Sequence, residues 1–117
     1  MDAAIALVKP GVTTDKIARA FLKAQQIGSE SEMAAFGLNF CHGIGLDLHE
    51  RPIIGRLNSF DDPMELQAAM MFAVETYCPA TDGVSAARIE EEIIVTPSGG
   101  QIITLFPAQE LPIANKY

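Results

Sequence analysis

Apolar residues recur at helical spacing in the N-terminal part of the chain. Residues 1–8 are apolar and rich in small side chains, and they stop at Lys9-Pro10-Gly11, so we expect the last turns of a helix there. Thr13 or Thr14 can cap a second helix. Its apolar residues follow at spacings of three and four, namely Ile17, Ala20, Phe21, Ala24 and Ile27. Gly28 is a natural C-cap, and we expect a polar connection over residues 29–33.

From Ala34 onward the pattern predicts short extended segments, because Phe36, Leu38 and Phe40 alternate with smaller or polar residues. Residues 51–62 are expected to form an irregular loop with several turn signals. Residues 64–69 have the pattern of a single helical turn. Residues 70–76 form an apolar run that predicts a buried strand, and residues 77–86 are expected to form a loop.

Two β-branched runs near the C-terminus, residues 88–96 and 101–106, predict a hairpin joined by Pro97-Ser98-Gly99-Gly100. The tail over residues 107–117 contains two prolines and is expected to lie over a surface. Helices followed by antiparallel strands indicate one α+β domain.

Composition narrows the class of protein. A chain of 117 residues is one domain by length, and its formal net charge of −7 argues against nucleic acid as a partner. No apolar run is long enough to cross a membrane, and the N-terminus lacks the basic leader of a signal peptide. Two cysteines, Cys41 and Cys78, make no disulfide framework. We therefore expect a reducing, cytoplasmic setting.

Both histidines of the chain, His42 and His49, lie seven residues apart on one glycine-containing segment. Neutral imidazole is a common ligand of transition metals and a common proton carrier. Glycines beside it allow close approach of the backbone to other groups. On spacing alone, His42 is equally consistent with a hydrogen-bonded loop residue, and His49 with a surface residue beside Glu50 and Arg51.

Two glutamates occupy strand positions that are expected to be apolar. Glu75 follows Phe72-Ala73-Val74, and Glu90 precedes a second apolar run. A carboxylate buried in a strand is costly unless it is paired or holds a metal. One imidazole and two carboxylates suit zinc, manganese, iron or cobalt. An exposed sheet face is the alternative for both glutamates.

Other candidates are weaker. Asp47, Glu50, Glu91 and Glu92 are acidic neighbours of the proposed ligands, and Glu91 must point to the sheet face opposite Glu90. Cys41 and Cys78 are expected to be small core residues.

Three motifs in order resemble the pita-bread metallopeptidases, the superfamily of Xaa-Pro aminopeptidases, prolidases, methionine aminopeptidases and creatinase. They are the segment 42–50, Phe72-Ala73-Val74-Glu75 and Arg88-Ile89-Glu90, and Lys9-Pro10-Gly11-Val12-Thr13 resembles a further family element. The tract 75–94 is most similar to the bacterial Xaa-Pro-peptidase-like members. The resemblance implies half of a pita-bread fold over residues 1–117, with a curved antiparallel sheet and one or two packed helices.

The resemblance also implies residue roles. His42, Glu75 and Glu90 match metal ligands, and Glu75 also matches a proton-transfer group. His49 matches the histidine that contacts the substrate carbonyl, and Arg88 matches an arginine that orients the carboxylate ligands. The implied reaction is hydrolysis in which two divalent ions (Mn, Co, Zn or Fe) share the stabilisation of developing charge.

Departures from the family pattern shape the remaining expectations. The family takes two further aspartates from strands that precede the helix at Met1, and neither Asp2 nor Asp15 replaces them. We therefore expect a truncated domain that holds one ion or none and is inactive alone. Cys41 and Ala69 stand where the family usually has glycine.

Three functions remain open at this point. The first is a truncated metallopeptidase domain whose parent hydrolyses Xaa-Pro dipeptides or removes N-terminal residues, with small peptides as substrates. The second is a non-catalytic module for binding or oligomerisation. The third is a lyase acting on dimethylsulfoniopropionate, which has a relative in this superfamily. A homo-oligomer is expected to cover the surface left by the missing half.

Overall fold

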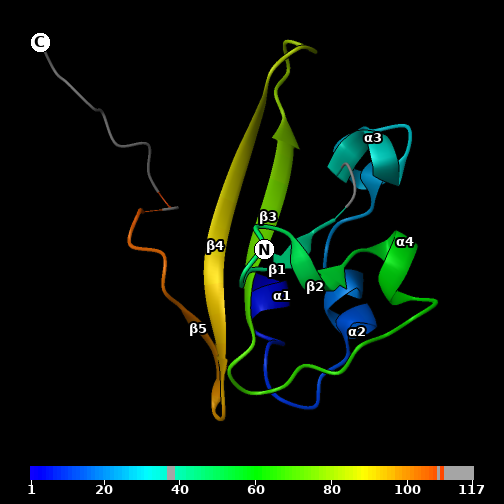
Figure 1. Cartoon of the computed structure of the whole chain (residues 1–117). Coiled ribbons are helices and arrows are strands. Elements are labelled where there is room, and N and C mark those ends of the chain that lie inside the picture. Colours follow the sequence, from blue (N-terminus) through cyan, green and yellow to red (C-terminus); the bar gives the residue numbers. More distant parts are fainter. Residues whose placement is uncertain (37–38, 108, 110–117) are drawn as a thin grey trace, which may run out of the picture.

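The computed structural model contains one five-stranded antiparallel sheet with the strand order β2-β1-β3-β4-β5. It describes residues 1–36, 39–107 and 109. The strands are β1 (Cys41–Gly43), β2 (Glu50–Ile54), β3 (Met71–Pro79), β4 (Ala86–Thr96) and β5 (Gly99–Ile102). The long hairpin of β3 and β4 dominates the sheet (Figure 1). This confirms the predicted α+β class.

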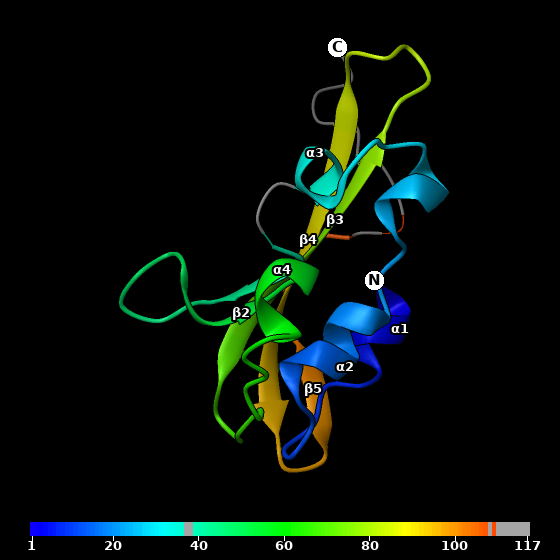
Figure 2. The same cartoon turned by 90° about the vertical axis from the view of Figure 1, so that its right-hand side faces the viewer.

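The helices are short and lie together on one side of that hairpin (Figure 1). They are α1 (Asp2–Ile5), α2 (Thr14–Arg19), the 3-10 helix η1 (Ala24–Ile27), α3 (Glu32–Phe36) and α4 (Arg56–Ser59). Seen from their side, α2 and α4 lie in front of the lower part of the sheet, α3 overlies its upper part, and α1 lies next to α2 (Figure 2). Among the described residues, no helix has the length and apolarity needed to cross a membrane.

The hydrophobic core lies between these helices and one face of the sheet. Its helical side includes Ala4, Ile17, Ala18 and Ala24, and its strand side includes Cys41, Ile54, Phe72, Val74 and Ile93. Because side chains alternate along a strand, the residues between these strand positions point to the opposite face. That opposite face is where His42 and Glu75 lie.

Strand register fixes which residues are neighbours on the face away from the helices. Directly paired residues share a face in an antiparallel sheet. His42 of β1 pairs with Ile53 of β2 and with Ala73 of β3. Two residues after Ala73 and on the same face of β3, Glu75 pairs with Glu90 of β4. The sheet therefore brings the predicted ligands of three strands into one small area.

Several predicted elements are confirmed. A helix begins at Asp2 and another at Thr14, and Gly28 ends η1 in the left-handed conformation with φ 76°. The buried strand at 70–76 corresponds to β3, and the C-terminal hairpin corresponds to β4 and β5. The second strand is shorter than predicted because it ends at Ile102.

Other predictions were wrong. The second helix does not run to Ile27, because α2 ends at Arg19 and η1 starts afresh at Ala24. The expected polar connection at 29–33 overlaps α3, so residues 34–36 are helical and not extended. The expected loop at 51–62 contains β2 and α4. The predictions for residues 37–38 and for most of 107–117 concern residues outside those that the structure describes.

The segment before β3 also departs from prediction. Residues 64–69 form no helical turn; Glu65 makes a bridge with Thr13 instead. The segment ends in a turn at Ala69, whose φ is +72°. Ala69 donates its N–H to Val95 at 2.8 Å, which ties the turn to β4. The expected loop at 77–86 is shorter than predicted, because β3 continues to Pro79.

Candidate metal centre

Three side chains with metal-binding atoms converge on the face away from the helices. His42, Glu75 and Glu90 each offer one ligand atom, and these atoms all lie within 4.8 Å of one another. His42 comes from β1, Glu75 from β3 and Glu90 from β4. This is the set proposed from the sequence, and adjacent strands bring it together.

The imidazole of His42 is buried, with 3 % of the residue exposed. Its Nδ1 lies 3.2 Å from the carbonyl oxygen of Gly43, and its Nε2 lies 3.1 Å from Oε1 of Glu75. When Nδ1 carries the proton and donates to Gly43, Nε2 of the neutral ring presents a lone pair to the carboxylate. A proton or a cation between the two atoms is then needed to remove their repulsion. A carbonyl partner on the remote nitrogen is also typical of metal-binding histidines.

Glu75 is the most constrained carboxylate of the centre, with 8 % of the residue exposed. Its Oε1 faces His42, and its Oε2 lies 2.8 Å from Nη1 of Arg88. Among the described residues, Oε2 accepts no hydrogen bond of good geometry despite this ion pair. The backbone of Glu75 is fixed as well, because its N–H donates to the carbonyl of Phe40 at 2.7 Å. A buried oxygen without a hydrogen bond retains a lone pair for another group.

The segment that enters β1 is held by the charged side chain of Arg56. Its guanidinium lies over the ring of Phe40 at 4.8 Å and makes an ion pair with Glu32 at 2.6 Å. Phe40 in turn stacks on Phe21 with ring centroids 4.3 Å apart. This packing fixes the start of the strand that carries His42.

Glu90 completes the three-residue cluster from the solvent side. It pairs with Glu75 across β3 and β4, and its side chain is exposed. The two carboxylates are like charges on directly opposite positions, which destabilises a strand pair unless a cation lies between them. Arg88 supplies part of that compensation through its ion pair with Glu75.

His49 lies against His42 although it is an exposed residue. The two ring centroids are 4.2 Å apart and their planes are tilted by 47°. His49 belongs to the loop 44–49 between β1 and β2, and it is outside the three-residue ligand cluster. The structure therefore brings it to the edge of the centre, with its ring accessible to solvent.

The weaker acidic candidates are separated from the cluster. Asp47 is exposed in the loop, and Glu92 shares the site face but lies on the far side of Ala73 from His42. Glu91 points to the helix-covered face, where 4 % of it is exposed, and its Oε2 has no hydrogen-bond partner among the described residues. The burial of Glu91 was not predicted from the sequence. The alternation along β4 could have indicated it, because Glu91 lies on the same face as the buried Ile93 and Val95.

Cys41 is a core residue, as predicted. It is fully buried and free, and its burial raises the pKa of its thiol well above the usual value, with the nearby Glu75 charge acting in the same direction and the N-terminal amino group acting against them. A neutral thiol on the opposite face is not a ligand of the centre. The side chain of Cys78 lies outside the described part of the chain.

The three donors suit a divalent transition ion. One imidazole nitrogen and two carboxylate oxygens form the mixed set that zinc, manganese, iron and cobalt accept. Zinc bonds of about 2.0–2.2 Å place neighbouring ligand atoms roughly 3.4 Å apart in a tetrahedron, close to the 3.1 Å between His42 Nε2 and Glu75 Oε1. Oε1 of Glu75, which faces His42, is the oxygen placed for the same role, while Oε2 makes the ion pair with Arg88. Three protein ligands leave at least one coordination position open.

The comparisons with known proteins agree on one protein family. The family model described as metallopeptidase family M24 matches residues 1–97. An uncharacterized peptidase of Staphylococcus epidermidis is 36% identical over 108 residues, which is 88% of this chain and 27% of that protein. The Xaa-Pro dipeptidase of Pyrococcus furiosus is 32% identical over 106 residues, which is 86% of this chain and 27% of that protein.

Solved structures show the same fold. The Xaa-Pro dipeptidase from Bacillus anthracis superposes with a TM-score of 0.68 at 30% identity, covering 90% of this chain and 28% of that one. The X-Pro aminopeptidase from Thermotoga maritima gives a TM-score of 0.69 at 29% identity, covering 91% of this chain and 28% of that one. The chain thus spans about a quarter of the length of the relatives it matches.

Proposed function

The chain belongs to metallopeptidase family M24, and we propose that it carries one side of the divalent-metal centre of a peptidase acting on Xaa-Pro dipeptides or on N-terminal residues. The observation that carries this proposal is the convergence of His42, Glu75 and Glu90 within 4.8 Å. The family implies a divalent metal in the parent enzymes, and relatives of this chain include Xaa-Pro dipeptidases. Small peptides are the proposed substrates.

The proposed roles follow from the contacts of each side chain. His42, Glu75 and Glu90 are the ligands on this side of the centre. The carbonyl oxygen of Gly43 accepts the hydrogen bond of Nδ1 of His42, so that Nε2 carries the lone pair that binds the ion. When bound, divalent metal supplies Lewis-acid polarisation and a nucleophile at neutral pH. Arg88 is a positioning residue, because it holds one oxygen of Glu75 while the other faces His42.

The substrate side of the proposal rests on His49 and Glu75. His49 is exposed, and its ring lies against that of His42 with the ring centroids 4.2 Å apart. A hydrogen bond from this imidazole to a peptide carbonyl would stabilise the negative charge that develops on the oxygen. Glu75 would accept a proton during attack and return it to the leaving amine, which is the work of a positioned carboxylate.

The isolated 117-residue chain is proposed to bind one ion and to hydrolyse peptides poorly. Three ligands can hold one ion, but the resemblance implies two further aspartates for a pair of ions. Those ligands would have to come from outside residues 1–117, in line with the quarter of the relatives' length that this chain spans. A reducing cytoplasm is the proposed setting and agrees with the free thiol of Cys41.

We also propose that the isolated chain associates with a second copy. Large apolar side chains are exposed at Leu46, Leu48, Ile102, Leu105 and Phe106. Exposed apolar side chains of this size favour burial against a partner. Light scattering at micromolar concentration checks this: a dimer or larger species is expected, and a clean monomer would contradict it.

The function is tested with the purified chain and added Mn²⁺, Co²⁺ or Zn²⁺. The chain is expected to take up about one ion, with hydrolysis of an Xaa-Pro dipeptide near the background rate. Hydrolysis should increase on adding any segment that supplies the remaining ligands. Absence of metal uptake by the folded chain would overturn the proposal and favour a non-catalytic binding module.

A further inference from the structure

The loop that carries His49 is shaped by the side chain of Glu50. Glu50 is the first residue of β2, and its Oε2 accepts a hydrogen bond from the backbone N–H of Asp47 at 3.3 Å. The loop also closes on itself, because the N–H of Gly45 donates to the carbonyl of Asp47 at 3.2 Å. The carboxylate of Glu50 therefore contacts the backbone of the loop that carries His49.

Two glycines make this arrangement possible. A Cβ added to Gly45 would lie 2.0 Å from Oε1 of Glu50, so the carboxylate packs directly on the glycine backbone. A Cβ added to Gly43 would lie 2.4 Å from the carbonyl oxygen of Arg51. Both distances are far inside van der Waals contact. A side chain at position 45 would force the Glu50 carboxylate out of its place.

The strand register explains why the loop needs such a support. His42 pairs with Ile53, but the next residue, Gly43, pairs with Glu50. Two residues of β2 are thus unmatched at the point where the loop leaves the sheet, and a bulge of this kind re-aims the side chains beside it. Ladder hydrogen bonds alone do not determine the direction of His49.

We propose that Glu50 is a positioning residue that holds the loop 44–49 so that the ring of His49 packs on His42. The ring-to-ring distance of 4.2 Å is the consequence of this contact. The catalytic meaning of the contact rests on the proposed function, in which His49 meets the substrate. The geometric claim can be tested without metal or substrate.

A competing role for Glu50 is that of a fourth metal ligand. The structure favours positioning, because the two oxygens of Glu50 are directed at Asp47 and Gly45, and Glu50 is not part of the three-residue cluster. The two roles predict different metal affinities after substitution. A positioning residue leaves affinity nearly unchanged, whereas a ligand lowers it severely.

The test compares three variants of the metal-free chain by NMR, using cross-relaxation between the ring protons of His42 and His49. Glu50→Ala removes the acceptor, Glu50→Gln keeps an acceptor oxygen of the same reach, and Asp47→Asn is the matched control in the same loop. We expect the cross-peak to be lost in Glu50→Ala and kept in the other two. Contacts between His42 and Ile53 report that the sheet is intact.

A cross-peak of wild-type strength in Glu50→Ala would overturn the proposal. If Glu50→Ala does not fold, Gly45→Ala replaces it, because the added methyl group displaces the same carboxylate; a retained cross-peak there would also overturn the proposal. Zinc affinity measured on the variants should change less than about twofold, and a loss of more than tenfold in Glu50→Gln would assign Glu50 as a ligand instead. Failure of the wild-type chain to bind zinc would refute the proposed function while leaving the NMR result to decide this inference.

Discussion

Substituting Ala69 by glycine is expected to stabilise the chain. Ala69 has φ +72°, a left-handed conformation that costs an L-residue about 1–2 kcal/mol. The backbone cannot relax out of it, because the N–H of Ala69 donates to Val95 and the N–H of Val95 donates to Met70, both at 2.8 Å. Ala69 is exposed, so the methyl group contributes little burial. The resemblance to the family, which usually has glycine here, points the same way.

The net magnitude is the difference between two terms. Relief of the strain is worth about 1–2 kcal/mol, and the greater freedom of glycine in the unfolded chain costs about 0.4–1 kcal/mol. We therefore expect Ala69→Gly to raise the free energy of unfolding by about 0.5–1 kcal/mol. For a domain of this size that corresponds to an increase in Tm of about 2–4 °C.

The assay is thermal and urea unfolding followed by far-ultraviolet circular dichroism, with Ala68→Gly as the matched control. Ala68 is the exposed neighbour in the same turn and is not among the residues with positive φ. Glycine there should lower the free energy of unfolding by about 0.4–1 kcal/mol. Equal destabilisation by both substitutions would refute the strain assigned to Ala69.

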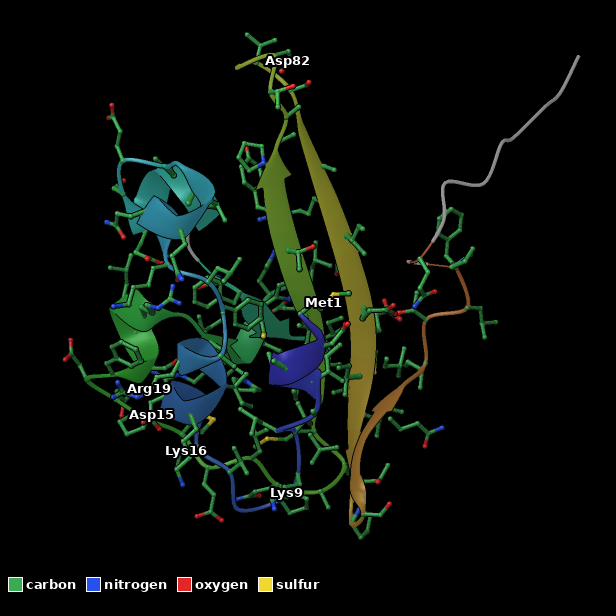
Figure 3. The ribbon with its side chains drawn as sticks, turned by 180° about the vertical axis from the view of Figure 1, so that it is seen from behind. Met1, Lys9, Asp15, Lys16, Arg19 and Asp82 are labelled. Carbon is green, nitrogen blue, oxygen red and sulfur yellow. The ribbon has the colours of Figure 1, made fainter. Side chains whose placement is uncertain are left out.

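Three further predictions concern the charged residues. Glu75→Gln should abolish the stabilisation by zinc, which for the wild-type chain at a free concentration 100 times Kd is about 2.7 kcal/mol or roughly 10 °C in Tm, measured by differential scanning fluorimetry. Glu91→Leu should raise the free energy of unfolding by about 1 kcal/mol or more in urea titrations, because the buried Oε2 of Glu91 has no hydrogen-bond partner among the described residues; a loss of stability would show that this carboxylate is paired. Asp82, at the tip of the β3–β4 hairpin (Figure 3), has a pKa lowered from 3.8 to about 2, chiefly by the hydrogen bond from Ser85. A lowered pKa contributes stability above pH 3.8 that is lost as the pH falls through about 2, so Asp82→Asn should flatten the pH dependence of unfolding in that window, and an unchanged profile would contradict the shift.

The long strands of the sheet were predictable from the sequence, whereas the short elements were not. Residues 70–76 and 88–96 carry long apolar or β-branched runs, and they correspond to β3 and β4. Short apolar runs such as Met33-Ala34-Ala35-Phe36 fit a helix turn or a strand equally well, which explains the error at α3. The turn signals within residues 51–62 predicted a loop there and hid β2, a strand of five residues at the edge of the sheet, where its proline, Pro52, is tolerated.

The convergence of the candidate residues was predictable from the sequence, but their surroundings were not. His42, Glu75 and Glu90 stand out because polar residues interrupt apolar strands, and the motif order singles out the same three residues, which the structure places together. The packing of His49 on His42 depends on the bulge and on the Glu50 carboxylate, which no periodicity reveals. Burial of Glu91 was missed because glutamate is rarely fully buried.

The positions of the charged groups around the sheet could not be predicted from the sequence and are seen only in the structure. Figure 3 shows Met1 beside β3 and β4, and the N-terminal amino group acts on the pKa of Cys41 from there. The same view places Asp15 and Arg19 together on α2, where they form an ion pair at 3.7 Å on the surface. Such an exposed pair contributes little to stability. At the candidate site, by contrast, Glu75 is buried and contacts the buried His42 and the half-exposed Arg88.

The central claim is that His42, Glu75 and Glu90 form one side of a metal centre. Calorimetric titration of Zn²⁺ into the wild-type chain, His42→Ala and His49→Ala tests it most directly. We expect about one ion per chain for the wild-type protein, similar binding for His49→Ala, and a loss of affinity of at least about tenfold for His42→Ala. Equal affinity in all three proteins would show that zinc binds elsewhere on this acidic chain and would contradict the account.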